Sequence, residues 1–511
     1  MGHPGPPDAH VAPPRQSAGR RAKKKPLTLR AALLDLWDEE TAPFRQRRSA
    51  QRARRLGLSQ LACLGRHTLT GLLCACGRQD RDWSAEYRLF SRAVWQPRAL
   101  FAPIVRGVLA DLPPGTPFVA AMDDTHLKKT GTRIPGVAYR RDPLSPAFHP
   151  NFIRAQRFLQ VSALRPETPP GGPARALPIA YEHVPAVPKP KAKATPAEQQ
   201  TYRDQRRRQN LSVAGVQALT RLRTDLDEQH AAADRQLIVS VDGSYTNRTV
   251  LRALPERTTL IGRTRKEAKL FAPAPPAATP TAGPPRRYGP RLPTPEALRQ
   301  DDTQPWQEVR AWACGREHTF RLKTLAPVWW AKAGPARPLR LVVIAPVGYR
   351  LRQGSKWLYR QPAYLLCTDP NLPLAELLQD YLWRWDIEVN HRDEKQLIGV
   401  GQAQLRAPRA VDRQPALAVA SYSLLLLAAA RVYGPGTPRG PLPLPKWQTK
   451  RPDQRRSTQE LLRQLRSEVW NDALSRLLPD YDGFVTGAPA PTKAPEPPLP
   501  AACALLYSAA G

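Results

Sequence analysis

Residues 381–395 read YLWRWDIEVNHRDEK, and the fold of the whole chain can be interpreted from this stretch. At 100° per residue, Tyr381, Arg384, Glu388 and Lys395 fall within about 60° of one another around a helix. A carboxylate between two basic groups is suited to hold a metal ion beside a phosphate, with the basic groups on the phosphate oxygens. The alternative is a solvated helix face with incidental charges, and spacing alone favours that alternative.

A metal site of this kind needs further carboxylates, and two upstream stretches offer them. PFVAAMDDTHLKK, residues 117–129, is a short apolar β run that ends in Asp123 and Asp124. By strand alternation these two neighbours face opposite sides of a sheet, so only one is expected to be a ligand. QLIVSVDGSYTN, residues 236–247, is an apolar strand followed by Asp242. An aspartate at a strand end lies where loops converge, although Asp-Gly is also ordinary turn chemistry.

The spacing of the four polar residues in 381–395 resembles the Y-R-E-K signature of bacterial insertion-sequence transposases of the DDE superfamily. The stretch FHPNFIRAQRFLQVSAL, residues 148–164, is similar to the same family between its first and second aspartates. The resemblance favours Asp124 over Asp123, because the family's first aspartate directly precedes a threonine, as Asp124 precedes Thr125. It covers about residues 28–433, and the four-residue signature is its most specific part.

The resemblance implies an α/β fold with a ribonuclease-H-like catalytic core. This core is a mixed sheet flanked by helices and interrupted by a β-rich insertion, with a helical region before it. Asp124, Asp242 and Glu388 would then be both the catalytic residues and the metal ligands. Two cations held by carboxylates can activate an attacking oxygen and stabilise a leaving one during in-line displacement at phosphorus. Oxygen ligands alone favour Mg²⁺, or Mn²⁺, over zinc.

The resemblance also suggests which side chains contact DNA. Arg384 and Lys395 would steady the phosphates beside the scissile bond, and Tyr381 would contact the backbone or position Glu388. A packing role for the tyrosine ring is the alternative. Trp329 and Trp330 are candidate stacking residues for an unpaired base at a transposon end, with core packing as the slightly favoured alternative.

The charge of the chain indicates a polyanionic partner. Its 78 Lys and Arg residues against 43 Asp and Glu residues give a net charge of +35, far more than solubility requires. The sequence has no run of about 18 apolar residues, so a membrane partner is not expected. The expected partners are double-stranded DNA, as transposon ends and as target, and a second copy of the chain in a homodimer on that DNA.

Cysteine usage indicates the compartment. The chain has six cysteines without the spacing of a small disulfide-bonded domain, and no signal peptide precedes them. We therefore expect a cytoplasmic, nucleoid-associated bacterial protein.

Composition shifts divide the chain into six segments. We predict a disordered basic tail over 1–27 and a helical DNA-binding region over 28–112, for which solvated basic helices packed on the core are the alternative. The remaining segments are the first part of the catalytic core (113–263), a Pro-rich linker with a β-rich insertion (264–370), the Glu-bearing helices (371–433), and a linker, basic helix and disordered tail (434–511).

The sequence therefore predicts a DNA transposase that cleaves transposon ends and joins their 3′-hydroxyls to target DNA. Two alternatives stay open. A non-catalytic basic DNA-binding relative would keep most of the same pattern, with the three carboxylates merely structural. A metal-dependent nuclease would cut DNA without joining strands.

Overall fold

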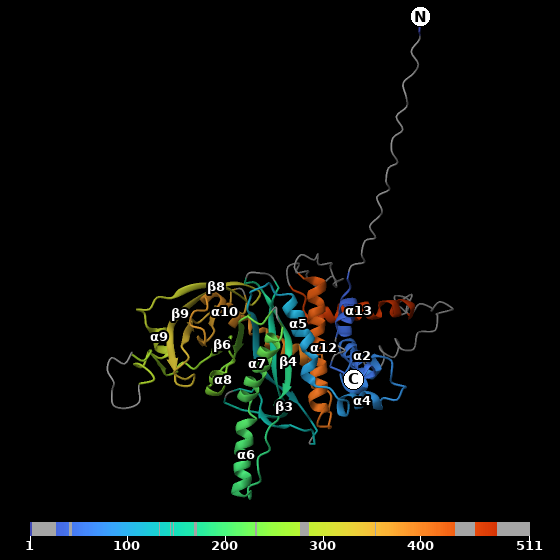
Figure 1. Ribbon diagram of the computed structural model, residues 1–511, viewed down its shortest axis with the longest axis horizontal. Coiled ribbons are helices and arrows are strands. Elements are labelled where there is room, and N and C mark those ends of the chain that lie inside the picture. Colours follow the sequence, from blue (N-terminus) through green and yellow to red (C-terminus); the bar gives the residue numbers. More distant parts are fainter. Residues whose placement is uncertain are drawn as a thin grey trace.

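The computed structural model describes residues 1–2, 27–39, 43–131, 133–143, 145–146, 148–167, 171–229, 232–275, 286–352, 354–434 and 455–477. The predictions made for the N-terminal tail, for the linker after residue 434 and for the C-terminal tail concern residues that lie almost entirely outside these ranges. Within them the chain forms one large mixed sheet with helices on both faces (Figure 1).

Five strands form the centre of the sheet, in the order β4-β3-β1-β5-β6. β1 pairs antiparallel with β3 and parallel with β5, and β5 pairs parallel with β6. This arrangement is the expected ribonuclease-H-like core, so the predicted fold class is confirmed. The strands are β1 (Phe118–Lys128), β3 (Phe152–Pro166), β4 (Ala174–His183), β5 (Leu237–Val241) and β6 (Thr258–Arg263).

The strands predicted as a β-rich insertion continue this same sheet. β13 pairs with β6, and β10, β9 and β7 follow outward, with β8 also on β9. β2 (Ala138–Arg141) extends the other side, beyond β3, and β11 (Gly348–Tyr349) pairs only with β12 (Leu358–Tyr359). The added strands are β7 (Leu270–Phe271), β8 (Gln307–Ala313), β9 (Arg316–Trp330), β10 (Leu339–Ile344) and β13 (Ala363–Cys367).

The predicted N-terminal helical region packs around one long helix, α12 (Ala410–Tyr433). Among the described residues, α12 is the one helix long and apolar enough to cross a membrane, yet 78% of its most apolar window is buried inside the protein. It is therefore packed as a core helix. Around it lie α1 (Leu29–Glu39), α2 (Arg47–Ala62), α3 (Leu69–Ala75), α4 (Ser84–Ser91), the 3₁₀ turn η1 (Pro97–Leu100) and α5 (Ala102–Ala110).

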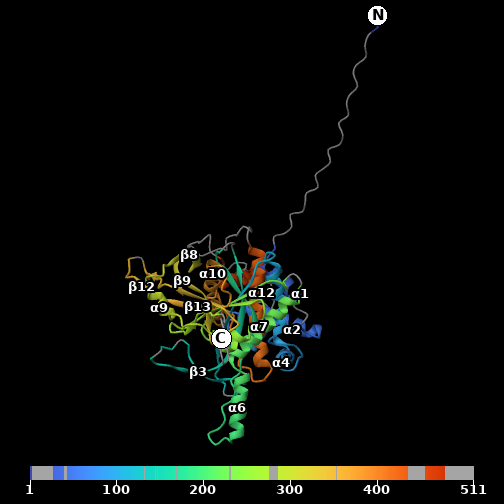
Figure 2. The ribbon, with the colours of Figure 1, turned by 60° about the vertical axis from the view of Figure 1, so that its left-hand side comes forward.

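The sequence of residues 197–229 predicts one long helix that covers a face of the sheet, and the structure has two helices there, between β4 and β5. Asn210 ends the first and caps the second, because its side chain accepts a hydrogen bond from Val213 N. α7 (Leu211–Asp227) packs on the sheet as predicted, whereas α6 (Pro196–Arg208) has no buried residue and projects from the body (Figures 1 and 2).

The stretch 381–395 is also divided, between α10 (Leu374–Trp383) and α11 (Asp386–Gln396). Arg384 and Trp385 between them keep helical dihedral angles, and the hydrogen bonds there join residues three apart. The helix therefore tightens for one turn but keeps its direction. The shorter helices α8 (Arg248–Arg252) and α9 (Pro295–Gln300) follow β5 and β7.

The last described helix, α13 (Thr458–Leu477), folds back onto α1 and α2. It was predicted as a basic amphipathic helix facing DNA or a partner. Its apolar face, with Leu461, Leu462 and Leu465, is buried in the main core.

Candidate active site

The register between β1 and β5 brings two aspartates together. Met122 pairs with Val241 as the last partners of this parallel ladder. Asp123 and Asp242 directly follow them, so continuing the register by one residue places them side by side on the same face of the sheet. Ala121 lies two residues before Asp123 and therefore faces the same side of the sheet. It packs with Trp383 of α10 and Ile387 of α11, the helix that carries Glu388, so Asp123 and Asp242 face these helices.

Asp242 is held by the turn that follows β5. One carboxylate oxygen accepts a hydrogen bond from Ser244 N at 2.8 Å, and the other accepts one from the Ser244 hydroxyl at 3.2 Å. This is the turn chemistry considered from the sequence. It also fixes the direction of the carboxylate at the end of the strand.

Arg384 lies between Asp123 and Glu388. One of its terminal nitrogens is 3.2 Å from Glu388 Oε1, and the other is 4.0 Å from Asp123 Oδ2. The Arg384 side chain is 11% exposed, while the two carboxylates are 19% and 36% exposed. One buried cation thus joins an aspartate from β1 to the glutamate from α11.

The carboxylates crowd one another. Burial raises the pKa of Asp123 to about 7, the negative charge of Asp242 adds to the rise, and Arg384 opposes it. A nearby like charge disfavours ionisation, so a cation bound here would relieve the repulsion.

Asp124 faces the opposite side of the sheet. Arg157 Nε is 3.1 Å from Asp124 Oδ2, and the Tyr245 hydroxyl donates to Asp124 Oδ1 at 3.4 Å. His126, two residues along the same face, has its Nε2 4.0 Å from Asp124 Oδ2. The sequence prediction chose Asp124, whereas the geometry brings Asp123 to Glu388, because alternation turns Asp124 away from α11.

Tyr381 and Lys395 lie around the same carboxylates. The Arg384 guanidinium lies 5.7 Å from the centre of the Tyr381 ring. Burial raises the pKa of Tyr381, Arg384 opposes this, and the charge of Asp242 contributes a further rise. Burial lowers the pKa of Lys395, while neighbouring carboxylates, Asp123 among them, counteract it. The charges of Asp242 and Asp123 thus act on Tyr381 and Lys395, respectively.

Tyr245 and Arg157 were missed from the sequence. The Tyr245 ring is fully buried, and the three charges of Asp124, Asp123 and Asp242 add to the rise in its pKa that burial causes. Tyr245 therefore stays neutral and can donate its hydroxyl proton to a carboxylate. Its place three residues after Asp242 was an available signal, but nothing in the spacing of Arg157 on β3 marks it.

The two tryptophans are not brought to the carboxylates. β5, β6, β13 and β10 lie between β1 and β9, which puts them about 24 Å away at about 4.8 Å per strand. Trp330 is 7% exposed and packs in the main core, and Trp329 Nε1 donates to the Pro335 carbonyl at 2.8 Å. These contacts are those of the packing alternative.

The donor set fits a hard divalent cation. Asp123, Asp242 and Glu388 supply only oxygen atoms, which suit Mg²⁺ or Mn²⁺. Within the described ranges, however, no three acidic, histidine or cysteine side chains are close enough together to hold a metal ion. Arg384 lies between Asp123 and Glu388, so a cation bound by these two carboxylates requires Arg384 to move toward another partner.

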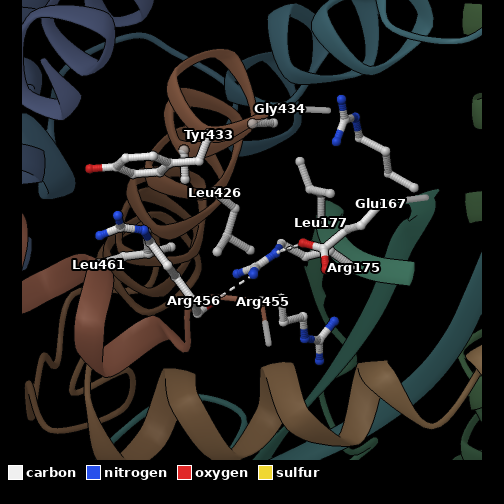
Figure 3. Close-up of a pocket in the computed structure, with 12 residues that line it drawn as sticks. Glu167, Arg175, Leu177, Leu426, Tyr433, Gly434, Arg455, Arg456 and Leu461 are labelled. Atoms are coloured by element: carbon white, nitrogen blue, oxygen red, sulfur yellow. Dashed lines mark hydrogen bonds and ion pairs between the residues drawn. The ribbon is translucent and has the colours of Figure 1, made fainter. Parts of the chain in front are cut away.

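A pocket lined by arginines lies apart from these carboxylates (Figure 3). It is formed by the ends of β3 and β4, the end of α12 and the segment that leads into α13. Its arginines contact neighbouring segments: Arg455 Nη2 is 2.7 Å from Asp386 Oδ1 at the start of α11, and Arg175 donates to the Arg456 carbonyl at 2.7 Å. The arginines are paired, so this pocket joins segments of the chain.

A comparison with protein families covers the part of the chain that carries Asp123, Asp124 and Asp242. The family model described as DDE superfamily endonuclease matches residues 41–327, more than half of the chain. The chain belongs to the DDE superfamily endonucleases. A comparison with curated proteins gave no match.

As a DDE superfamily endonuclease, the chain is of the nuclease or transposase type, acts on DNA and depends on divalent metal ions. The matched range includes Asp123, Asp124 and Asp242 and ends before Glu388. The Y-R-E-K residues therefore rest on their position in the structure and on the resemblance of their spacing.

Proposed function

We propose that this DDE endonuclease is an insertion-sequence transposase that cleaves transposon ends and joins their 3′-hydroxyls to target DNA. Its reactive centre consists of Asp123, Asp242 and Glu388. The proposal keeps two of the three carboxylates predicted from the sequence and replaces Asp124 by Asp123.

The observation that carries this proposal is the pair of contacts made by Arg384. They connect β1 to α11 across more than 250 residues of sequence and place Glu388 on the face of Asp123 and Asp242. A purely structural ion pair needs one carboxylate for one arginine. Here one arginine faces two carboxylates, and a third lies beside them, so the centre holds an excess of negative charge that a cation would balance.

Mg²⁺ or Mn²⁺ held by these carboxylates would supply activation of the attacking oxygen and charge stabilisation of the leaving one. The side chains do the positioning. Ser244 fixes the Asp242 carboxylate, and Arg384 connects Glu388 of α11 to Asp123. Arg384, displaced from its carboxylates, and Lys395 would bind the phosphates beside the scissile bond, since both are cations on this face. Tyr381 supports Arg384 from below its guanidinium.

Nicking of supercoiled plasmid tests the catalytic assignment. With Mg²⁺ or Mn²⁺, we expect Asp123→Ala, Asp242→Ala and Glu388→Ala each to lower the nicking rate at least about a thousandfold, equivalent to about 4 kcal/mol of transition-state stabilisation. Asp124→Ala is the matched control, because it removes the neighbouring carboxylate from the opposite face. We expect it to lose far less activity. A dead Asp124→Ala beside an active Asp123→Ala would reverse the assignment, and full nicking by all four variants would exclude it.

Strand joining separates a transposase from a nuclease. Pre-cut duplexes of the element's own ends, with free 3′-hydroxyls, are incubated with protein, Mg²⁺ and a target plasmid. We expect covalent joining of the labelled 3′ end to the plasmid, and we expect the reactive species to be a homodimer on DNA. Plasmid cutting without joined product would identify a nuclease instead.

A further inference from the structure

The helix α6 contributes no residue to the core, so core packing does not account for it. None of its 13 residues is buried, and both views show it projecting away from the sheet and its covering helices (Figures 1 and 2). Its first turn is closed by a capping box between Thr195 and Glu198. Local capping therefore stabilises a helix that receives no apolar packing.

The outer surface of α6 carries a stripe of arginines. Arg203, Arg206 and Arg207 are spaced three and four residues apart, so they lie on one side of the helix, and all three are exposed. The two acidic residues do not cancel this stripe. Glu198 is engaged in the cap, and Asp204 lies 3.1 Å from the Gln200 amide and 3.9 Å from Arg207.

The segment that leads into α6 adds positive charge. Lys189, Lys191 and Lys193 are exposed in the sequence VPKPKAK, which contains no acidic residue. The arginine stripe and these three lysines together form what we term the basic arm, residues 189–208.

The basic arm is attached at the edge of the sheet that carries the carboxylates. Asn247, in the loop after Asp242, donates to the Ser212 hydroxyl in the first turn of α7 at 2.8 Å and to the Ser244 carbonyl at 2.7 Å. α6 ends two residues before α7 begins. The C-terminal end of the arm thus lies beside the Asp242 loop, and α6 extends outward from there.

We propose that the basic arm binds the phosphates of duplex DNA that flanks the cleavage site. The inference deepens the proposed function and rests on it, because it takes the scissile phosphate to lie at Asp123 and Asp242. A helix of 13 residues is about 20 Å long, enough to follow several phosphates of one strand.

The composition of the arm favours duplex DNA over other acidic partners. Binding of single strands uses aromatic rings as stacking platforms, and Tyr202 is the one aromatic residue in the arm. Protein interfaces depend on buried apolar or aromatic anchors, and the exposed stripe offers only charge. Contacts of arginine and lysine with phosphates need neither.

Fluorescence anisotropy with a labelled duplex of about 40 base pairs tests the arm. The full-length protein is titrated without divalent metal ions, so that no cutting occurs, over a series of salt concentrations. Arg203→Ala together with Arg206→Ala removes two charges, and alanine preserves the helix. Arg310→Ala together with Arg316→Ala is the matched control, since these exposed arginines lie on β8 and β9, away from α6.

We expect the arm variant to bind more weakly. The negative slope of the logarithm of its association constant against the logarithm of the salt concentration should become shallower by about 2, while the control keeps the wild-type slope. The double substitution Arg203→Glu and Arg206→Glu should weaken binding further. An arm variant with the wild-type slope, or a control with the same loss, would overturn the proposal. An equal loss on single-stranded DNA of the same length would assign the arm to single strands instead.

A failure of the proposal for the basic arm can be distinguished from a failure of the proposed function. Asp123→Ala should keep the wild-type salt slope and lose nicking, whereas the arm variant should keep its single-turnover nicking rate at saturating protein. If the wild-type protein never nicks DNA but the arm variant still loses binding, the proposed function fails and phosphate binding by the arm remains.

Discussion

At the scale of single residues, the adjacent carboxylates of Asp123 and Asp124 have different partners: Asp123 lies near Arg384, whereas Asp124 contacts Arg157 and Tyr245. Strand alternation correctly indicated that the two carboxylates face opposite sides. It could not indicate which face the glutamate helix covers, because that depends on how α10 and α11 return to the sheet more than 250 residues later. The neighbouring threonine, a local signal, selected Asp124. The long-range contact made by Arg384 favours Asp123.

His67 gives a prediction at the same scale. It is 5% exposed against Gly399, and burial lowers its pKa to about 4, with Arg466 adding to the decrease. The unfolded chain binds a proton here near pH 6.5, so it holds more protons than the folded chain between about pH 6.5 and 4. The free energy of unfolding should therefore fall as the pH is lowered through this window, by roughly 3 kcal/mol from His67 alone.

Urea unfolding at pH 7 and pH 5 measures this effect. Burial lowers the pKa values of His126 and His391 as well, so the wild-type protein combines several contributions. The difference between the wild type and His67→Gln isolates one of them. We expect the variant to lose less stability than the wild type between the two pH values, and equal losses would contradict the assigned burial.

At the scale of elements, the start of α11 is held by Arg455. Arg455 donates to Asp386, the first residue of that helix, and to the Ala174 carbonyl of β4. Asp386 is 19% exposed and would be left without its partner in Arg455→Met. We expect this variant to lose about 3 kcal/mol of stability, because a partly buried carboxylate then loses its hydrogen-bonded counter-charge.

Hydrogen exchange of the α11 amides distinguishes this local role from general destabilisation. Exchange should rise in α11 more than in α12, and the nicking rate should fall because Glu388 lies two residues after Asp386. Arg463→Met, an exposed arginine on α13, is the control and should change neither. Asp386→Asn added to Arg455→Met should restore part of the stability. If it does not, the ion pair does not hold the helix.

Elements differed in how well the sequence predicted them. β1 and β5 were predicted because a continuous apolar run that ends in aspartate is a strong local pattern. The strands β8, β9, β10 and β13 lie in stretches that were predicted as strands, but their union with the core sheet was not predicted, because the alternation of apolar residues along one strand does not identify its neighbouring strand. The break after Arg208 was missed, since the arginines of α6 favour helix and only Asn210 signalled a new start.

At the scale of the molecule, the first and last described helices, α1 and α13, pack against each other. The Glu468 carboxylate of α13 accepts hydrogen bonds from Leu29 N and Arg30 N, which caps the start of α1. Arg466 donates to the carbonyls of Leu61 and Cys63 at the end of α2. The last helix therefore satisfies the free backbone groups of two helices near the beginning of the chain.

Truncation tests whether this closure stabilises the whole protein. A chain ending at Gly434 loses both caps and uncovers the surface that buries Leu461, Leu462 and Leu465. Each buried leucine contributes about 2 kcal/mol, so we expect a melting temperature several degrees lower. A chain ending at Leu477 keeps α13 and should melt like the full-length protein. If the two truncated chains melt alike, α13 does not stabilise the N-terminal helices. If only the shorter chain is weakened, Glu468→Ala should reproduce part of its loss, because that substitution uncaps α1 and leaves the leucines in place.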